Sequence, residues 1–236
     1  MKHALCLGAL VALTLHSAVN LEARTATQLT SDARILARDP SATGRPRFSD
    51  AQILDLLNEA QRDAIADTLC ILKSYSFDTA VNTTYYAMPS DYIAVNRLLS
   101  DDQKLDEKSP AKLDLASKEW ETQEGEVQNF FVHFASRTKL GFYPVPDVAG
   151  DTTTIRVDYY AQATDMEAGG TPFNSITEFK PFHAMLAFYA AAYMLYIDGM
   201  AAGDRYMARY LTDKAKMQGY CVNRPTYSPN VNIMPK

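Results

Sequence analysis

The sequence predicts an α+β protein, a helical bundle from both chain ends with an antiparallel β-rich insertion and an extended C-terminal tail. Apolar residues recur at helical spacing in residues 25–79 and 166–221, whereas residues 80–165 alternate apolar and polar side chains over short runs. The 236 residues suit one elaborated domain. Residues 1–24 form an apolar N-terminal arm, and residues 222–236 form the tail.

The composition is that of a globular protein. Hydrophobic residues make up 47% of the chain and charged residues 22%, which excludes a disordered polyelectrolyte. The net charge is −5, with 23 Lys and Arg against 28 Asp and Glu. This balance argues against a general basic surface for nucleic acid.

The arm allows two interpretations. Lys2 and His3 precede an apolar run at residues 4–15, as in a secretory signal. The positions before Ala18 and Ala23 suit cleavage poorly, because bulky side chains stand where small ones are required. We favour an intact helical arm that is buried or faces a partner, since apolar residues continue in steps of three or four at Leu15, Val19, Ala23, Ala26, Leu29, Ala33 and Leu36. One hypothesis is that this arm packs on a neighbouring subunit.

The strongest local signal is the start of a helix at residue 50. Ser49 is the N-cap residue and Gln52 stands three positions later, which makes a capping box. Phe48 can pack on Ile53 as a hydrophobic staple. The helix is expected to run to about Lys73, with one apolar face formed by Ile53, Leu57, Ala60, Ala64, Thr68 and Leu72.

The insertion is expected to hold short strands, an acidic loop and one short helix. Residues 85–88 predict an extended segment, and residues 91–99 a strand or turn. The acidic stretch at residues 100–107 predicts a solvated loop. Ser109 and Pro110 predict a helix that runs to about Trp120. A three-stranded antiparallel meander is predicted at residues 127–134, 138–143 and 152–160.

Two more helices and the tail complete the chain. Residues 181–197 are uncharged and apolar, but they fall short of the roughly 20 residues that a membrane span needs, so we expect a buried bundle helix. It should end near Gly199, and a last helix should cover residues 204–220. The tail, rich in Pro and Asn, is expected to be extended.

No catalytic, cofactor or metal site is predicted. Phosphate-binding loops, nucleophile elbows and metal-ligand spacings are absent from the sequence. The four histidines are scattered, and we expect His133 and His183 to be structural. Four arginines flank the first loop and could meet an acidic partner or phosphate, although a structural role is the simpler hypothesis; they are Arg34, Arg38, Arg45 and Arg47.

The three cysteines are Cys6, Cys70 and Cys221. Their number is odd, their spacings are long, and no histidine accompanies them. They are therefore expected to be small buried hydrophobic residues in a reduced compartment.

Five stretches of the chain, in order, resemble the tailed-phage head-to-tail adaptor, or connector, proteins. They are residues 33–39 (Ala-Arg-Ile-Leu-Ala-Arg-Asp), residues 47–63 (opening Arg-Phe-Ser-Asp-Ala-Gln), residues 140–147 (Leu-Gly-Phe-Tyr-Pro-Val-Pro-Asp), residues 155–160 (Ile-Arg-Val-Asp-Tyr-Tyr) and residues 179–186 (Phe-Lys-Pro-Phe-His-Ala-Met-Leu). The resemblance covers roughly residues 25–220, and the arm is longer than that family leads us to expect.

The resemblance implies a non-enzymatic virion protein at the head–tail junction. Such adaptors form a ring, usually of twelve copies, beneath the portal protein, extend the DNA channel without specific DNA binding, and dock tail or nozzle proteins. The resemblance implies no membrane and no cofactor. It also implies that the tail docks on the portal, through Val222, Asn223, Arg224, Pro225, Thr226, Tyr227 and Ile233.

The acidic stretch suggests a further role. We expect Asp101, Asp102, Asp106 and Glu107 to face the channel lumen or a neighbouring subunit. Two alternatives to the adaptor remain. One is a secreted or envelope-associated bacterial binding protein with a cleaved N-terminal signal. The other, less favoured, is a hydrolase whose site is assembled from distant residues.

Overall fold

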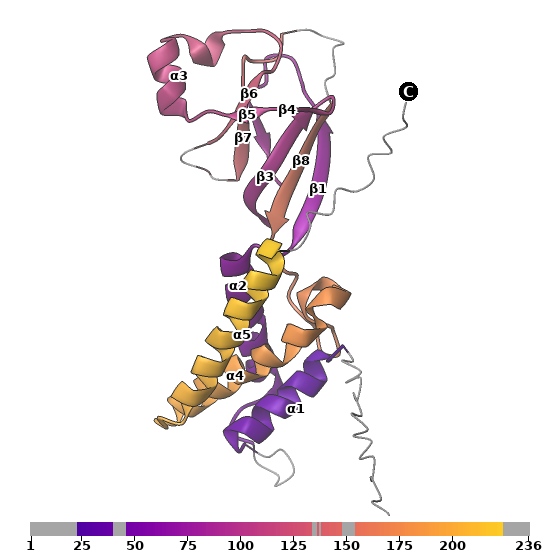
Figure 1. Ribbon diagram of the computed structural model, residues 1–236, viewed down its shortest axis with the longest axis vertical. Coiled ribbons are helices and arrows are strands. Elements are labelled where there is room, and N and C mark those ends of the chain that lie inside the picture. Colours follow the sequence, from indigo (N-terminus) through magenta and orange to yellow (C-terminus); the bar gives the residue numbers. More distant parts are fainter. Residues whose placement is uncertain (1–22, 40–45, 134–135, 137, 148–153, 224–236) are drawn as a thin grey trace, which may run out of the picture.

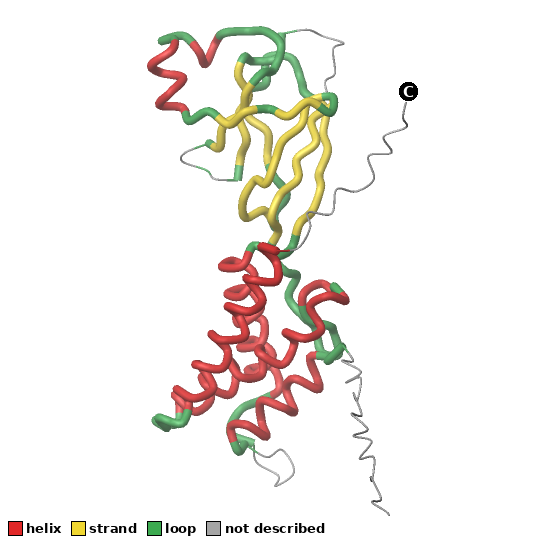
Figure 2. The backbone as a smooth tube through the Cα atoms, in the orientation of Figure 1, coloured by secondary structure: helices red, strands yellow, loops and turns green. Residues whose placement is uncertain are grey.

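The computed structural model describes residues 23–39, 46–133, 136, 138–147 and 154–223. Figures 1 and 2 show the long helices gathered at one end of the molecule, and the strands at the other end together with a short helix. Four helices lie in the helical part, namely α1 (Ala26–Ala37), α2 (Asp50–Thr68), α4 (His183–Ile197) and α5 (Gly203–Asn223). The mixed helix-and-sheet class predicted from the sequence is confirmed.

Helix α4 occupies the centre of the helical part. It is apolar all round, and residues on every side of it are buried, which is the pattern of a helix enclosed by others. Helices α1 and α2 contact it from the N-terminal part of the chain, and α5 contacts it from the C-terminal part. Gly199 follows it at a φ of 70°, a left-handed conformation that favours glycine. Among the described residues, no helix is long and apolar enough to cross a membrane.

The start of α2 matches the sequence prediction. The side chain of Ser49 accepts a hydrogen bond from the backbone of Gln52, and the side chain of Gln52 accepts one from the backbone of Ser49. The end was predicted wrongly, because α2 stops at Thr68 and Leu69 turns left-handed at a φ of 51°. Leu72 therefore opens a strand instead of extending the helical face.

Helix α1 begins at Ala26, not further upstream. Thr25 is extended and forms a capping box with Gln28, so the chain changes direction there. The predicted run of apolar steps from Leu15 to Leu36 therefore does not form one continuous helix. The apolar run at residues 4–15 lies outside the described residues.

The strands form two four-stranded sheets. The first has the order β1 (Leu72–Asp78), β8 (Thr154–Ala161), β3 (Tyr92–Ser100), β4 (Gln103–Lys104). The second has the order β2 (Tyr85–Ala87), β7 (Lys139–Tyr143), β6 (Asn129–Val132), β5 (Asp106–Glu107).

The predicted meander is correct for β6 and β7, which pair antiparallel, and wrong for β8. Strand β8 lies between β1 and β3 in the first sheet. The prediction assigned the start of β1 to the preceding helix, which left β8 without its long-range partner. A buried ion pair also fixes β8, since Arg97 of β3 and Ser74 of β1 both donate to Asp158. Burial alone favours the neutral acid, but these hydrogen bonds lower the pKa of Asp158.

The acidic stretch was also predicted wrongly, since it is a hairpin and an edge strand. Asp101 and Asp102 have φ values of 45° and 65°, as a tight two-residue turn between β3 and β4 requires. Strand β5 follows after one residue. The predicted helix to Trp120 is shorter than expected, because α3 (Pro110–Ala116) stops early and Trp120 begins a 3-10 turn (Trp120–Thr122).

Trp120 anchors this region to the second sheet. Its ring meets Phe131 edge to face, with ring centroids 5.1 Å apart. Gly141, opposite Phe131 in β7, leaves room for the same ring, because an added Cβ would lie 2.2 Å from it. Any side chain at Gly141 would therefore displace the aromatic cluster.

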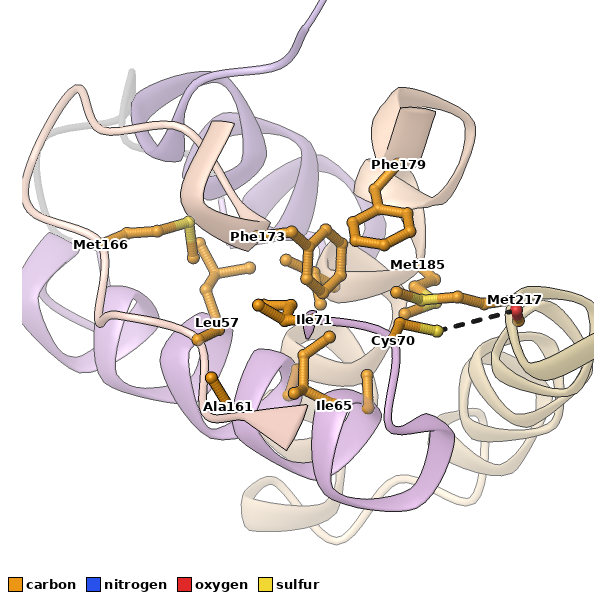
Figure 3. Packing of buried hydrophobic residues seen from close by; sticks show 14 of the residues in the cluster. Leu57, Ile65, Cys70, Ile71, Ala161, Met166, Phe173, Phe179, Met185 and Met217 are labelled. Carbon is orange, nitrogen blue, oxygen red and sulfur yellow. Dashed lines mark hydrogen bonds between the residues drawn. The ribbon is translucent and has the colours of Figure 1, made fainter. Parts of the chain in front are cut away.

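Two buried amides on α2 hold the segment that returns from the sheets. Asn58 donates to the carbonyl of Met166 and accepts from its N–H. Gln61 donates to the carbonyl of Thr164 and accepts from the N–H of Phe173. Figure 3 shows Met166 and Phe173 packed beside Leu57 of the same helix. The sequence analysis missed this role, although two amides three residues apart on an apolar helical face were a usable signal.

We expect Gln61→Leu to lower the free energy of unfolding by about 3 kcal/mol. The change leaves two buried backbone groups without partners, each worth about 1–3 kcal/mol. Urea denaturation monitored by circular dichroism measures the difference. The matched control is Gln218→Leu on the exposed side of α5, where we expect a change within about 0.5 kcal/mol. Equal stabilities of the two variants would contradict the role of Gln61.

Candidate functional site

Two arginines of the predicted basic cluster form salt bridges within the folded chain. Buried Arg34 contacts Asp39 at 2.9 Å and Asp50 at 2.5 Å. Arg47 forms a salt bridge with Asp198 at the end of α4, and its N–H donates to Asp39 at 2.8 Å. The structural hypothesis is therefore correct for these two. Arg38 is exposed, and Arg45 lies outside the described residues.

A second cluster of titratable groups ties α2 to α5. The Tyr210 hydroxyl donates to the carbonyl of Ala60 and to Asp63. Lys214 contacts Asp63 at 2.9 Å and Asp67 at 2.6 Å. Burial and the neighbouring Asp63 raise the pKa of Tyr210, so the phenol stays protonated. Every group here has a partner within the fold, and the arrangement serves packing.

Segment 101–126 carries the net charge of the whole chain. It holds nine Asp and Glu against four Lys, and the rest of the chain holds 19 acidic and 19 basic residues. All nine acidic side chains are exposed. Among the described residues, Asp102 makes the one salt bridge of these nine, with Arg156 at 3.7 Å. This segment is therefore the strongest electrostatic feature of the described surface.

The four acidic residues singled out from the sequence lie in one row across both sheets. Asp101 and Asp102 form the turn after β3, while Asp106 and Glu107 form β5 of the second sheet. Leu105 between them is buried, and its N–H donates to the carbonyl of Leu98 at 2.9 Å. The structure brings the four together and leaves them open to a partner.

The predicted docking tail begins inside a helix. Helix α5 runs to Asn223, so Val222 and Asn223 are helical instead of extended. Val222 is 76% exposed. The C-terminal end of α5 reaches the base of the sheets (Figure 1). The other predicted docking residues lie outside the described residues: Arg224, Pro225, Thr226, Tyr227 and Ile233.

A disulfide corrects the expectation of unpaired cysteines. Cys70, just after α2, is bonded to Cys221 in the last turn of α5, with a Cα–Cα distance of 5.5 Å. The two residues are 151 positions apart, so their spacing gave no signal. The Cys70 sulfur also lies 3.9 Å from the carbonyl oxygen of Met217, to which a reduced thiol could donate (Figure 3). The bond fixes the point from which the tail leaves the protein.

His183 holds the start of α1. Its Nδ1 accepts a hydrogen bond from the backbone N–H of Arg24 at 3.2 Å, and its buried Nε2 has no partner among the described residues. Burial lowers the pKa of His183 to about 4, so the imidazole is neutral near pH 7. The predicted structural role fits this geometry. His133 accepts from the N–H of Ser136 at 3.0 Å and packs edge to face on Tyr85.

Exposed apolar side chains occur in both the helical part and the sheet-bearing part of the molecule. Leu115, 89% exposed, stands on α3 beside the acidic residues of segment 101–126. Ile35, Ile197 and Met200 are exposed in the helical part. No cluster of metal-binding side chains occurs in the part of the chain that the structure describes. The arrangement provides surfaces for protein contacts.

Comparison with known proteins identifies a family. The model of the SU10 adaptor protein family matches residues 24–231, which is most of the chain. No curated protein matches the sequence. The family match includes all five stretches that carry the resemblance, and it confirms that resemblance.

We expect His183→Asn to reduce the loss of stability between pH 6.5 and pH 4. In this window the unfolded chain binds a proton at His183, whose ordinary pKa is 6.5, while the folded protein does not until about pH 4. Stability therefore falls as the pH falls, by up to about 3 kcal/mol from this group. The asparagine Oδ1 can replace Nδ1 as the acceptor for Arg24.

Urea denaturation at pH 7 and at pH 4.5 provides the measurement. Gln218→Asn, a non-titrating change on the exposed side of α5, is the control and should keep the pH dependence of the unchanged protein. A pH dependence that is the same with and without His183 would show that another group is responsible.

Proposed function

Since the chain belongs to the SU10 adaptor protein family, we propose that it is a structural head-to-tail adaptor of a tailed phage. In this proposal it forms a ring beneath the portal protein at the head–tail junction of the virion, extends the DNA channel and docks tail or nozzle proteins. The family match carries the proposal.

A closed ring of identical subunits needs two different contact faces on each subunit. The exposed apolar residues supply candidates at both ends of the molecule, with Leu115 on α3, Ile197 at the end of α4 and Met200 just after it. Large apolar side chains are enriched at the cores of such interfaces. We propose twelve copies, the number that the resemblance implies.

The acidic row is proposed to face the channel. Twelve copies at a net charge of −5 would carry a charge of about −60, concentrated in segment 101–126. A wall of that sign repels DNA phosphates and lets the duplex slide without specific binding. Asp101, Asp102, Asp106 and Glu107 would then line the lumen, and contact with a neighbouring subunit is the alternative.

We propose five functional units. They are the arm (residues 1–24), the N-terminal helices of the bundle (residues 25–79), the β-rich insertion (residues 80–165), the C-terminal helices of the bundle (residues 166–221) and the docking tail (residues 222–236). Contacts of α4 with α1, α2 and α5 support the joining of both ends of the chain in one bundle. The disulfide supports the tail as a docking segment, because a fixed exit point restricts where the tail can reach.

One alternative has an observation in its favour. Disulfides persist mainly in oxidising compartments, so the bond between Cys70 and Cys221 suits a secreted or envelope-associated binding protein. The apolar run at residues 4–15 would then be part of a cleaved signal. The hydrolase hypothesis has no such observation in its favour.

Native mass spectrometry of the full-length protein, alone and with its portal protein, tests the proposal. A full-length chain that joins the portal as a ring of matching copy number supports the adaptor. A monomer that lacks its first twenty or so residues and ignores the portal would favour the secreted protein.

We expect the fourfold variant Asp101→Asn, Asp102→Asn, Asp106→Asn, Glu107→Gln to assemble into rings through which DNA passes several-fold more slowly at low salt. Removing the repulsion lets phosphates approach the wall, and added salt should restore the rate by screening. DNA ejection from assembled particles is the readout. The control neutralises Glu119, Glu121, Glu124 and Glu126, which changes the net charge by the same amount. No change in ejection or in ring assembly would count against both proposed roles.

We expect deletion of residues 224–236 to abolish portal binding and to leave the free energy of unfolding within about 0.5 kcal/mol of the full-length value. The deletion keeps α5 and the disulfide, so the folded part retains its contacts. Co-sedimentation with portal rings measures binding. Full portal affinity after the deletion would place the docking surface elsewhere.

A further inference from the structure

An apolar groove lies between α1 and α4. It has a volume of about 230 Å³, larger than the ~150 Å³ cavity that can hold a benzene ring. Ile35 and Leu36 of α1 form one wall, and Ala184, Ala187 and Phe188 of α4 form the other. The groove is therefore large enough for one or more apolar side chains.

One side of the groove is fully accessible. Ile35 is 72% exposed, whereas Leu29 and Ala33 of the same helix are buried. The rim carries a salt bridge between Arg24 and Asp32, both partly exposed. An apolar floor with a charged rim is the pattern of a surface that another segment covers.

The chain enters the described structure beside this groove. The N–H of Arg24 donates to Nδ1 of His183, the residue before the groove residue Ala184. The N–H of Ala26 donates to the carbonyl of Gly170 at 2.7 Å. These two bonds fix the first described residues, so the preceding segment starts at the rim of the groove.

We propose that the apolar run at residues 4–15 folds back and occupies this groove in its own chain. Thr25 caps α1 in an extended conformation, so the arm is not held in line with the helix. Residues 16–23 can span up to about 28 Å, whereas the distance along α1 from Arg24 to Leu36 is about 18 Å. The arm is thus long enough to reach every wall residue.

The tether favours the chain's own arm over other occupants. Residues 16–23 join the apolar run to the rim of the groove, and a connection of this length gives an effective concentration of about 1 mM, far above the concentration of other copies in dilute solution. When the apolar run occupies the groove, both Ile35 and the run are shielded from water. The free subunit thereby keeps its largest apolar segment away from other proteins. This inference does not depend on the proposed adaptor function.

Cys6 lies within the apolar run and reports on its exposure, because Cys70 and Cys221 are bonded to each other. The test measures the rate at which a fluorescent maleimide labels Cys6 in the oxidised full-length protein. We expect labelling about tenfold faster in Ile35→Asp than in the unchanged protein. That protection corresponds to an intrinsic dissociation constant near 0.1 mM at an effective concentration near 1 mM.

Leu115→Asp is the matched control, since it places the same charge on a similarly exposed apolar residue of α3. It should label at the rate of the unchanged protein. Equal rates in Ile35→Asp and the unchanged protein would overturn the proposal, and so would a purified chain that lacks residues 4–15.

A second measurement separates the chain's own arm from that of a neighbour. In Ile35→Cys, oxidation should link Cys6 to the new cysteine and give a product that runs as a monomer on a non-reducing gel. The protection of Cys6 should not change on dilution. A dimer-sized product, or protection that disappears on dilution, would show that a second copy supplies the arm and would overturn the proposal.

Discussion

The burial of α4 is the constraint on which the rest of the fold depends. A helix that is apolar on every side must be enclosed, because each large side chain left in water forfeits about 1.5–3 kcal/mol. The cover comes from α1 and α2 before it and α5 after it. Since α2 and α4 are separated by both sheets in the sequence, the sheets must leave and return at one place. Three features hold this connection between the helices and the sheets. They are the left-handed C-terminal end of α2, the amides of Asn58 and Gln61, and the disulfide.

The five stretches that carry the family resemblance contain the residues that connect the elements of this fold. Arg34, Asp39 and Asp50 form the ionic contact between α1, the first loop and α2. Asn58 and Gln61 hold the returning segment, Gly141 admits the ring of Phe131, and Asp158 joins three strands. His183 fixes the start of α1. The resemblance is thus carried by residues that maintain a scaffold, as is expected of a family whose role is to hold other proteins in position.

The sequence was informative where a signal is local and failed where a contact is distant. The capping box of Ser49 and Gln52, the buried helix before Gly199 and the hairpin of β6 and β7 each depend on neighbours within a few residues. Strand β8 depends on β1 and β3, which lie far away along the chain, and no periodicity reveals such partners. The same reason explains the missed disulfide. The acidic row was identified from composition, but its turn geometry needs the two positive φ values at Asp101 and Asp102.

The pairing of charges differs between the helical part of the molecule and segment 101–126. In the helical part, arginines and lysines are matched to carboxylates, several of them buried, so these charges stabilise the bundle and leave little for a partner. In segment 101–126 the acidic side chains are exposed and almost all lack an ionic partner among the described residues. Mutual repulsion of this kind lowers the stability of an isolated subunit and has no compensation within it. A feature that is unfavourable in the free protein is best explained by what the protein meets, and in the channel-facing arrangement that we propose this partner is a DNA duplex, whose phosphates such a surface repels.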